Sequence, residues 1–399
     1  MKLIDTKTKN NVLQSMMTIL DKKRNEIIEA NKKDLEAFGK SDRAMYDRLI
    51  VDEKKVDSMI QSVMEVMEQE DPVGKTLEHR RLDTGLDITN KTAPFGTIMI
   101  IYESRPDVTI EAAVLAFKAN NKIYLKGGKE AFHSNKILEQ CWHEALQENG
   151  LDKNWIEMLK LDRTETQEFL KNPPEHIDLI VPRGGERLIA FVKEHATGAV
   201  LVSGRGNNFL YVSKNADFET AKKVMLNAKI DKISGCNALD KVLIDKNISG
   251  YEDKLKELQK MFHENEVSIL VDEDVSKVLT DEDKVPSEDT WYEEFLAMKI
   301  VLGSIDGLDQ AIEKINKYSG GHSASIITTD KEEAKTFMEQ VDCAAVYHNA
   351  STRFTDGGQM GVGAELAIST DKLHHRGPLG LKQLVTNKYY VLGEGHIRE

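Results

Sequence analysis

The feature that most constrains the fold is an alternation of short apolar runs with longer amphipathic stretches, which begins at residue 97. TIMIIY, KIYLKG, HIDLIV and AVLVSG are typical of buried strands, and the stretches between them show helical periodicity. A second block of the same kind runs from residue 251 to residue 349. Strands that alternate with helices form parallel sheets with crossover helices. The sequence therefore predicts an α/β protein with two doubly wound domains.

Two further segments precede the first block. Residues 8–70 carry apolar side chains at three- and four-residue steps, which predicts a helical scaffold. Residues 79–96, HRRLDTGLDITNKTAPFG, instead form two short extended pieces around the turn DTG, which predicts a β-hairpin. Because a protruding hairpin often serves assembly, we expect at least a dimer.

The composition excludes several classes of function. The 399 residues carry a net charge of -13, whereas nonspecific nucleic-acid binding needs Lys and Arg to replace the counterions of phosphate. The chain lacks a run of about 18 apolar residues, and its N-terminus lacks the apolar core of a signal peptide, so we expect no membrane span and a cytoplasmic location. The three cysteines have no CxxC spacing, and His374 and His375 have no suitably spaced acidic or thiol ligand. We therefore expect neither a disulfide framework nor a metal site.

Two glycine-bearing turns follow predicted strands and precede predicted helices. A helix N-terminus presents free N–H groups and the positive end of the helix dipole, and glycine lets a phosphate approach closely. The alternative is an ordinary strand-to-helix turn with surface lysines, and the GxGxxG dinucleotide fingerprint is missing. We predict that at least one turn binds a nucleotide phosphate; the residues are Lys126, Gly127, Gly128 and Lys129 in YLKGGKE, and Gly184 and Gly185, beside Arg183, in IVPRGGERL.

Glycine-rich loops near the C-terminus gather arginine, amide and hydroxyl side chains. Arginine binds carboxylate and phosphate in a bidentate manner, and hydroxyls complete such a shell. The alternative is a set of loops stabilised by local side-chain turns. We interpret the loops as a site for a small anion, formed by Asn349, Ser351, Thr352, Arg353, Asp356 and Arg376.

Among the three cysteines, Cys236 has a distinct setting, because it follows Ser234 and Gly235 at the junction of the two blocks. Cys141 lies in a predicted helix and Cys343 enters an apolar strand, so both are expected to fill the core. A reactive thiol needs an exposed, electropositive setting. Composition alone leaves Cys236 open between a buried hydrophobe and a nucleophile.

Six stretches, taken together in their order and spacing, resemble the γ-glutamyl phosphate reductase family of the aldehyde dehydrogenase superfamily. They are IIYESRPDVTIEAA, KGGKEAFHSN, VPRGGERLI, SGCNALDKVLI, HNASTRFTDGG, and HRGPLGLKQL followed by GEGHIR. The resemblance runs from about residue 10 to the C-terminus and implies an aldehyde-dehydrogenase-like fold with a β-hairpin oligomerisation element. It also implies four functional parts: an NADP-binding domain of residues 1–78 and 98–232, a catalytic domain of residues 233–350, substrate-binding loops of residues 351–379, and an oligomerisation element of residues 79–97 and 380–399.

The resemblance implies a reaction and a nucleophile. The family reduces L-glutamate 5-phosphate to L-glutamate 5-semialdehyde with NADPH, the second step of proline biosynthesis from glutamate, which implies functional coupling to glutamate 5-kinase. By its place in SGCNAL, Cys236 is the implied nucleophile. An acyl phosphate carries a good leaving group, so a thiolate can displace phosphate and leave a thioester that hydride reduces. We expect the backbone N–H of Cys236 to stabilise the oxyanion, and the Ser-Gly pair to supply slack that lets the thiol face the cofactor cleft.

Several positions differ from those of the aldehyde-oxidising relatives. Ser104 stands where they carry an Asn donor, and its hydroxyl is the expected second oxyanion donor. Val202 stands near the glutamate that activates water in thioester hydrolysis, so the thioester is expected to persist until hydride arrives. Lys129 stands close to the acidic residue that binds the adenosine ribose, which favours NADP over NAD, whereas the neighbouring Glu130 acts against this preference.

Other positions match the superfamily with less definite roles. Glu294 matches the residue that holds the nicotinamide-side ribose, with a surface carboxylate as the alternative. In GHSA, Ala324 replaces the carboxylate of the family motif, and we interpret His322 as a structural histidine rather than a base. Arg105, Arg353 and Arg376 are the expected partners of the substrate's phosphate and carboxylate groups, without an assignment of each to one group.

Two rival functions remain open on the sequence. The first is an aldehyde dehydrogenase that hydrolyses its thioester, against which Val202 speaks. The second is a catalytically silent, oligomeric binding protein on the same fold, against which the intact Cys236 and the anion-binding loops speak.

Overall fold

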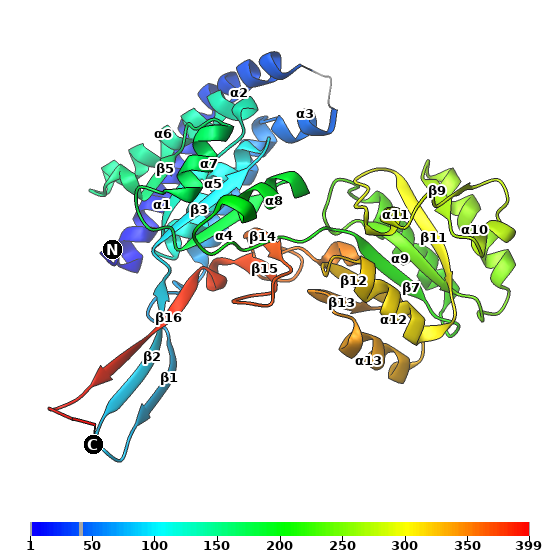
Figure 1. Cartoon of the computed structure of the whole chain (residues 1–399). Helices are drawn as coiled ribbons and strands as arrows, with labels where there is room; N and C mark the ends of the chain where they lie inside the picture. The colour runs from blue at the N-terminus through cyan, green and yellow to red at the C-terminus, as the bar shows by residue number, and fades with distance from the viewer. Residues whose placement is uncertain (1, 40–42, 399) are drawn as a thin grey trace. The chain divides into compact units, whose positions relative to one another are not determined.

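The computed structural model describes residues 2–39 and 43–398, and the chain divides into two compact units (Figure 1). Unit 1 comprises residues 1–202, 362–367 and 379–399, and unit 2 comprises residues 203–361 and 368–378. The units therefore separate after residue 202, whereas we placed the start of the catalytic domain at residue 233. The difference arises because β7 (Asn208–Val212) pairs with strands of unit 2 and α9 (Phe218–Ile230) packs in a core of that unit.

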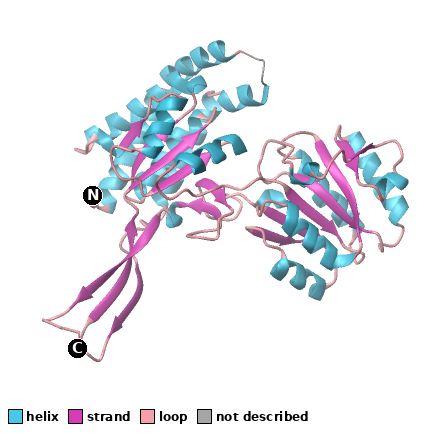
Figure 2. Ribbon diagram, in the orientation of Figure 1, coloured by secondary structure: helices cyan, strands magenta, loops and turns pink. Residues whose placement is uncertain are grey.

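Unit 1 is built on a parallel sheet with strand order β5-β4-β3-β6 and helices on both faces (Figure 2). Along β3, alternate side chains enter two different cores: Ile98 and Ile100 pack among α1, α4, α5 and α6, while Met99 and Ile101 pack among α7 and α8. The predicted strand TIMIIY is thus confirmed, and it is apolar throughout because both of its faces are covered. The elements of this layer are α1 (Thr6–Lys22), α2 (Arg24–Phe38), α3 (Arg43–Leu49), α4 (Glu53–Glu68), β3 (Thr97–Tyr102), α5 (Pro106–Lys118), β4 (Lys122–Lys126), η1 (Lys129–Ala131), α6 (Phe132–Glu148), η2 (Lys153–Trp155), β5 (Ile156–Met158), α7 (Arg163–Lys171), β6 (Leu179–Arg183) and α8 (Glu186–His195).

The run AVLVSG differs from its predicted strand. Among the described residues it makes a single bridge, from Val200 to Ile180 on β6, flanked by hydrogen bonds from Ile180 N to Ala199 O and from Leu201 N to Ile180 O. The chain crosses into unit 2 after Val202, so the run ends before a ladder can form.

Unit 2 contains a parallel sheet with strand order β10-β9-β11-β8-β7-β12-β13, again between two cores. Leu210 and Val212 of β7 face the core that holds α9 and α10, whereas Phe209 and Tyr211 face the core that holds α12 and α13. The remaining elements are β8 (Leu239–Asp245), α10 (Tyr251–Glu264), β9 (Ser268–Val271), η3 (Val275–Lys277), β10 (Asp283–Lys284), α11 (Asp289–Tyr292), β11 (Lys299–Ile305), α12 (Gly307–Tyr318), β12 (Ser323–Ile327), α13 (Lys331–Gln340), β13 (Ala345–His348) and η4 (Thr352–Phe354).

The acidic stretch of residues 272–294, whose composition alone predicts a solvated surface segment, is only partly solvated. Val275, Leu279 and Trp291 are buried, and Trp291 stacks on Phe209 with ring centroids 6.5 Å apart. Single apolar residues within this charged run pack into the core. The overall composition of the run did not indicate this packing.

The predicted hairpin is confirmed and is joined by a C-terminal strand. β1 (Thr76–Arg81) pairs with β2 (Asp87–Pro94), which pairs with β16 (Val385–Leu392), and this three-stranded sheet projects from the rest of unit 1 (Figure 2). β14 (Glu365–Ser369) and β15 (Gly377–Gly380) form a further two-stranded sheet, followed by η5 (Leu381–Gln383). Across the part of the chain that the structure describes, none of the helices combines the length and apolarity needed to cross a bilayer.

Candidate active site

Cys236 lies half-buried in a turn between α9 and β8 of unit 2. Two backbone hydrogen bonds close this turn, from Gly235 N to Lys232 O at 3.1 Å and from Ala238 N to Gly235 O at 3.0 Å. A Cβ atom on Gly235 would lie 2.8 Å from Asn237 Oδ1 and 2.9 Å from Arg353 Nη1. The glycine is therefore needed for close packing, and the slack that we expected from the Ser-Gly pair is not what the geometry shows.

The two other cysteines are buried, as predicted. Burial raises the pKa of Cys141 to about 12 and that of Cys343 to about 11, so both remain protonated thiols at neutral pH. Cys236 is thus the most accessible of the three thiols.

The segment GRGNN before β7 supports the Cys236 turn, and sequence reasoning missed it. A Cβ atom on Gly206 would lie only 2.0 Å from the carbonyl oxygen of Cys236, so the two backbones touch. Nδ2 of the buried Asn208 donates to the same carbonyl oxygen at 2.8 Å. The sequence feature that could have indicated this support is the pair of amide residues Asn207 and Asn208 at the start of the buried strand β7.

Two of the predicted substrate residues, Ser351 and Arg353, lie beside the Cys236 turn, together with Thr352 of the same loop. Ser351 caps η4, and the next residue, Thr352, donates its hydroxyl to Asn237 O at 2.8 Å. Nε of Arg353 donates to Asp231 at 2.9 Å, and its Nη1 lies close to Gly235. The structure therefore brings a cationic side chain to the edge of the turn that carries the thiol.

The other two predicted C-terminal substrate residues make their contacts elsewhere. Both ends of the Asn349 amide bind the backbone of Thr328, at 3.0 and 2.9 Å, at the end of β12. Arg376 pairs with Asp342 at 2.6 Å, and hydrogen bonds from Lys372 and Arg376 lower the pKa of that carboxyl. These contacts join residues 21 and 34 positions apart in the chain, so they are not the local side-chain turns of the alternative interpretation.

Glu294 is half-buried, and the residues before and after it are hydrogen-bonded to the start of β8. Phe295 N donates to Asp240 Oδ2 at 2.9 Å, and the ammonium of Lys241 donates to Glu293 O at 2.7 Å and lies 3.8 Å from the Phe295 ring. Burial lowers the pKa of Lys241 to about 7. Since Asp240 and Lys241 follow Cys236 closely in the chain, the same short segment carries the Cys236 turn and holds the residues around Glu294.

The predicted cofactor turns of unit 1 meet at one edge of its sheet. Ile101 pairs with Lys126 and Tyr102 with Arg183, so the turns of residues 126–129 and 183–185 lie on either side of the end of β3. The carboxyl ends of parallel strands are the usual place for a ligand in such sheets. Ser104 and Arg105 follow the same strand end.

The two turns differ in the donors that they leave for a phosphate. At the start of α6, the N–H groups of His133 and Ser134 donate to Asp34 at 2.9 and 2.7 Å, and the Glu130 carboxylate fills the space over Gly128. At the start of α8, Gly185 provides no side-chain cap and no atom of the described residues lies within 4 Å of its Cβ position, whereas Glu103 Oε2 lies 2.7 Å from the Cβ position of Gly184. Among the described residues, the open space over Gly185 therefore favours the start of α8 over that of α6 for a cofactor phosphate, with the exposed Lys129 on the neighbouring turn.

Ser104 is buried and has a left-handed backbone, with a φ of 40°. Its N–H and its hydroxyl both donate to Glu130, at 2.8 and 2.7 Å. Next to it, Arg105 and Lys55 contact Asp107; although burial acts to raise the pKa of Asp107, these cations hold it below its usual value. The hydroxyl expected to serve an oxyanion is thus engaged by a carboxylate of unit 1.

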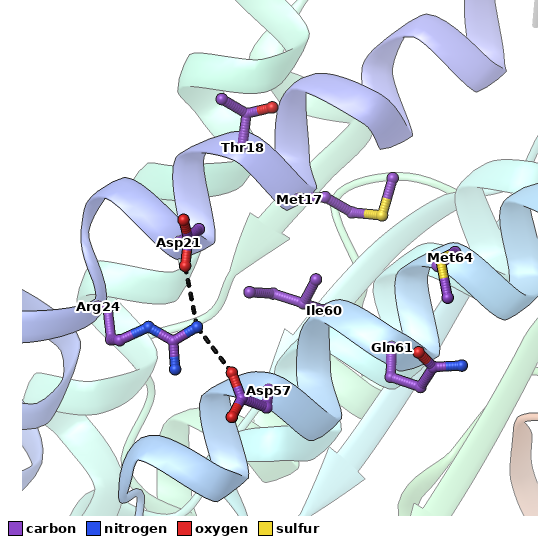
Figure 3. A pocket seen from close by; sticks show the side chains of 8 residues that line it. All are labelled: Met17, Thr18, Asp21, Arg24, Asp57, Ile60, Gln61 and Met64. Atoms are coloured by element: carbon purple, nitrogen blue, oxygen red, sulfur yellow. Dashed lines mark hydrogen bonds and ion pairs between the residues drawn. The ribbon is translucent and has the colours of Figure 1, made fainter.

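A shallow pocket of unit 1 lies apart from the predicted site residues. It is lined by residues of α1 and α4 together with Arg24, which pairs with Asp21 at 2.9 Å and with Asp57 at 2.7 Å (Figure 3). Its one arginine is already paired with two carboxylates, so the pocket offers no unpaired positive charge to an anionic ligand.

Comparisons with known proteins agree over almost the whole chain. The model of the aldehyde dehydrogenase family matches residues 1–277 and 282–365. A γ-glutamyl phosphate reductase of Dictyoglomus turgidum is 41% identical over 400 residues, which cover 100% of this chain and 95% of that protein. The crystal structure of γ-glutamyl phosphate reductase from Thermotoga maritima is 40% identical with a TM-score of 0.94, over 99% of this chain and 95% of that one.

A more distant solved structure shares the fold alone. It is an engineered glycolyl-CoA reductase with bound NADP+, 15% identical with a TM-score of 0.67, over 98% of this chain and 92% of that one. The family match and the full-length relatives together show that this chain belongs to the aldehyde dehydrogenase family, within its γ-glutamyl phosphate reductase branch.

Proposed function

We propose that this chain reduces L-glutamate 5-phosphate to L-glutamate 5-semialdehyde and phosphate, with NADPH as the reductant and Cys236 as the nucleophile. The observation that carries the proposal is the Cys236 turn, in which a half-buried thiol sits on a tightly held backbone beside the guanidinium of Arg353. Similarity over the full length to γ-glutamyl phosphate reductases supports the choice of substrate.

The proposed reaction has two displacements at one carbon atom. The Cys236 thiolate attacks the acyl carbon, the bond from that carbon to the phosphate oxygen breaks, and phosphate leaves with the electron pair. The backbone N–H of Cys236 is proposed to stabilise the oxyanion, and Arg353, whose Nη1 lies beside Gly235, is proposed to bind the departing phosphate. When bound, NADPH supplies the hydride for the thioester carbonyl. The carbon–sulfur bond then breaks and returns the thiolate on Cys236.

Two separate sets of residues are proposed to hold the cofactor. In unit 1 they are Gly184 and Gly185 at the start of α8, with Lys126 to Lys129 on the neighbouring turn. In unit 2, Glu294 is proposed for the ribose on the nicotinamide side, held by the contacts of its neighbours with Asp240 and Lys241. We propose NADPH rather than NADH because Lys129 is exposed and charged where a 2′-phosphate would be recognised.

The two rival functions predict different assays. A hydrolytic aldehyde dehydrogenase needs a base that activates water, and Val202 cannot act as one. A silent binding protein needs no accessible thiol, whereas Cys236 is only half-buried.

One assay distinguishes these functions. The protein is supplied with glutamate semialdehyde, NADP and phosphate, and NADPH formation is followed. We expect formation that requires phosphate and is lost in Cys236→Ala. Turnover without phosphate would support the hydrolytic enzyme, and absence of turnover in well-folded protein would support the silent binder.

We also propose that the three-stranded sheet joins copies of this chain. On β16, Tyr389, Tyr390, Val391 and Leu392 are 42–69% exposed, and β1 is exposed along its length. Exposed apolar strands at a sheet edge are suited to pairing with another chain. Sedimentation of the wild type is expected to give an oligomer, and Val391→Lys with Leu392→Lys is expected to give a smaller species; a monomeric wild type would contradict the proposal.

The substrate itself suggests a partner reaction. An acyl phosphate reacts readily with water, so a kinase that makes it from glutamate must supply it close to the site of use. We therefore propose functional coupling to glutamate 5-kinase.

A further inference from the structure

A ring of buried polar side chains lies next to the Cys236 turn, and the proposed chemistry does not use it. Its members come from β7, from the turn, from the start of β12 with the residue before it, and from the loop after η4. None of them is more than 4% exposed, so water does not compete for their hydrogen bonds. They are Asn208, Asn237, His322, Ser323 and Thr355, and we call them the polar ring.

Asn208 is the member that holds the backbone of the turn. Its Nδ2 lies 2.8 Å from the carbonyl oxygens of Gly206 and Cys236, and 2.7 Å from that of Ala238. Carbonyl oxygens only accept hydrogen bonds, so the nitrogen of the amide must face them and Oδ1 must face the other way. The peptide that follows Cys236 is therefore fixed by a side chain from a different strand.

His322 orients this amide from its other side. Nδ1 of His322 lies 3.1 Å from Asn208 Oδ1, and because that oxygen only accepts, Nδ1 must carry the hydrogen. Nε2 then carries a lone pair and has no hydrogen-bond partner among the described residues, so a charged imidazole would bury an N–H without an acceptor. Burial correspondingly lowers the pKa of His322 to about 4, and the imidazole is neutral at physiological pH.

The ring closes on the residue after Cys236. His322 Nδ1 also lies 2.7 Å from Ser323 Oγ, which lies 2.7 Å from Thr355 Oγ1. The carbonyl oxygen of Thr355 accepts from Asn237 Nδ2 at 2.9 Å. The turn is thus held at Cys236 by one end of the ring and at Asn237 by the other.

We propose that Asn208 and His322 are positioning residues for Cys236. The neutral imidazole orients the Asn208 amide, and this amide fixes the peptide after Cys236, so that the thiol and its backbone N–H keep their direction. The inference rests on the proposed role of Cys236 as the nucleophile. His322 is fully buried and acts through Asn208, without contact to the substrate. A reacting group displaced by about 1 Å loses about 100-fold in rate, so a fixed turn matters for catalysis.

Two serines on β12 provide a matched test. Ser323 and Ser325 are both fully buried; the Ser323 hydroxyl lies 2.7 Å from both His322 Nδ1 and Thr355 Oγ1 within the polar ring, whereas the Ser325 hydroxyl donates at 2.7 Å to Ala350 O, outside it. We would compare Ser323→Ala with Ser325→Ala, and His322→Leu with His322→Asn, since an Asn amide can restore an N–H near the position of Nδ1. The measurements are kcat and KM in the phosphate-dependent assay, the rate of Cys236 alkylation by iodoacetamide as a function of pH, and the melting temperature.

Ser323→Ala and His322→Leu are expected to lower kcat by about tenfold with little change in KM, and to alter the pH profile of Cys236 alkylation. Ser325→Ala is expected to lose a similar amount of melting temperature without these changes, and His322→Asn is expected to recover most of the rate. Equal kcat in the two serine variants overturns the inference, as does a His322→Asn variant no better than His322→Leu. If His322→Leu does not fold, the serine pair decides.

The failure of this inference is distinct from the failure of the proposed function. A wild type without phosphate-dependent turnover, or an active Cys236→Ala, would refute the function. The alkylation profile needs no turnover, so it tests the polar ring in either case.

Discussion

Gly206→Ala is expected to inactivate the protein while leaving it folded, because Gly206 touches the backbone that carries the nucleophile. The added Cβ atom would lie 2.0 Å from the carbonyl oxygen of Cys236, 2.5 Å from its carbonyl carbon and 2.6 Å from its Cα. Ordinary contact begins at 3.4 Å, so the peptide has to retreat by about 1.4 Å. The obstacle is backbone on both sides, so no side-chain rotation can relieve it.

The size of the effect follows from this displacement. A shift of about 1 Å in a reacting group costs about 100-fold in rate, so we expect kcat to fall by at least that factor. Overpacking of this kind costs about 1–3 kcal/mol of unfolding free energy, which urea melts followed by circular dichroism would measure.

Gly358→Ala is the matched control for this variant. Gly358 is exposed, and its added Cβ atom would meet only the flexible Asp356 carboxylate at 3.3 Å. NADPH formation from glutamate semialdehyde, NADP and phosphate is measured for both variants, with alkylation of Cys236 as a second readout. A folded Gly206→Ala protein that keeps kcat within about threefold of the wild type would refute the reasoning, because the turn would then tolerate a displacement that we expect to abolish its geometry.

Three further changes test other parts of the site. Lys241→Met removes the ammonium that donates to Glu293 O and holds the segment around Glu294. KM for NADP in initial-rate assays is therefore expected to rise about tenfold. An unchanged KM would contradict a role of Lys241 in holding the cofactor-binding segment. Burial lowers the pKa of His322 from 6.5 to about 4 in the folded state, so on acidification the unfolded chain binds a proton before the folded chain does. The unfolding free energy should therefore fall by about 1.4 kcal/mol per pH unit as the pH drops from 6.5 towards 4. Urea melts at several pH values should show a smaller slope in His322→Asn than in the wild type, and an equal slope would argue against this effect of His322. Glu130→Gln removes a negative charge next to Lys129 and should shift kcat/KM towards NADP over NAD severalfold, whereas a shift towards NAD would be inconsistent with a 2′-phosphate at that turn.

The predicted strands of the first block were confirmed where apolar runs lie between covering helices. TIMIIY is β3 and KIYLKG contains β4, because burial on both faces demands apolar residues without interruption. AVLVSG has the same composition but makes one bridge, since a strand needs a partner and the chain leaves the sheet there. In this run only Leu201 is buried and Ala199 is exposed, so an apolar run without covering partners predicts neither pairing nor full burial.

In the candidate site, too, some residues could be predicted from the sequence and others only from the tertiary structure. The SGCNAL motif singles out Cys236, and its neighbour Arg353 was predicted from the loop composition. Asn208 and His322 were missed as supports of the thiol, because they lie 28 and 86 positions away along the chain and belong to strands that meet only in the folded sheet. Asn349 and Arg376 were predicted from the loop composition as anion-binding residues, and in the folded chain their side chains bind Thr328 and Asp342, which the composition did not reveal.

By itself, the sequence determined the alternating α/β architecture, the hairpin, the family and the cysteine, because each of these depends on residues that are neighbours in the chain. The tertiary structure decided where the units separate, which helix start binds a protein carboxylate through its N–H groups, and which side chains hold the Cys236 turn. These features depend on hydrogen bonds and close contacts between distant segments, such as Asp34 with α6 and Gly206 with Cys236. Local patterns carry no information about such contacts, since the same residue types would satisfy their polar groups equally well with water or with other partners.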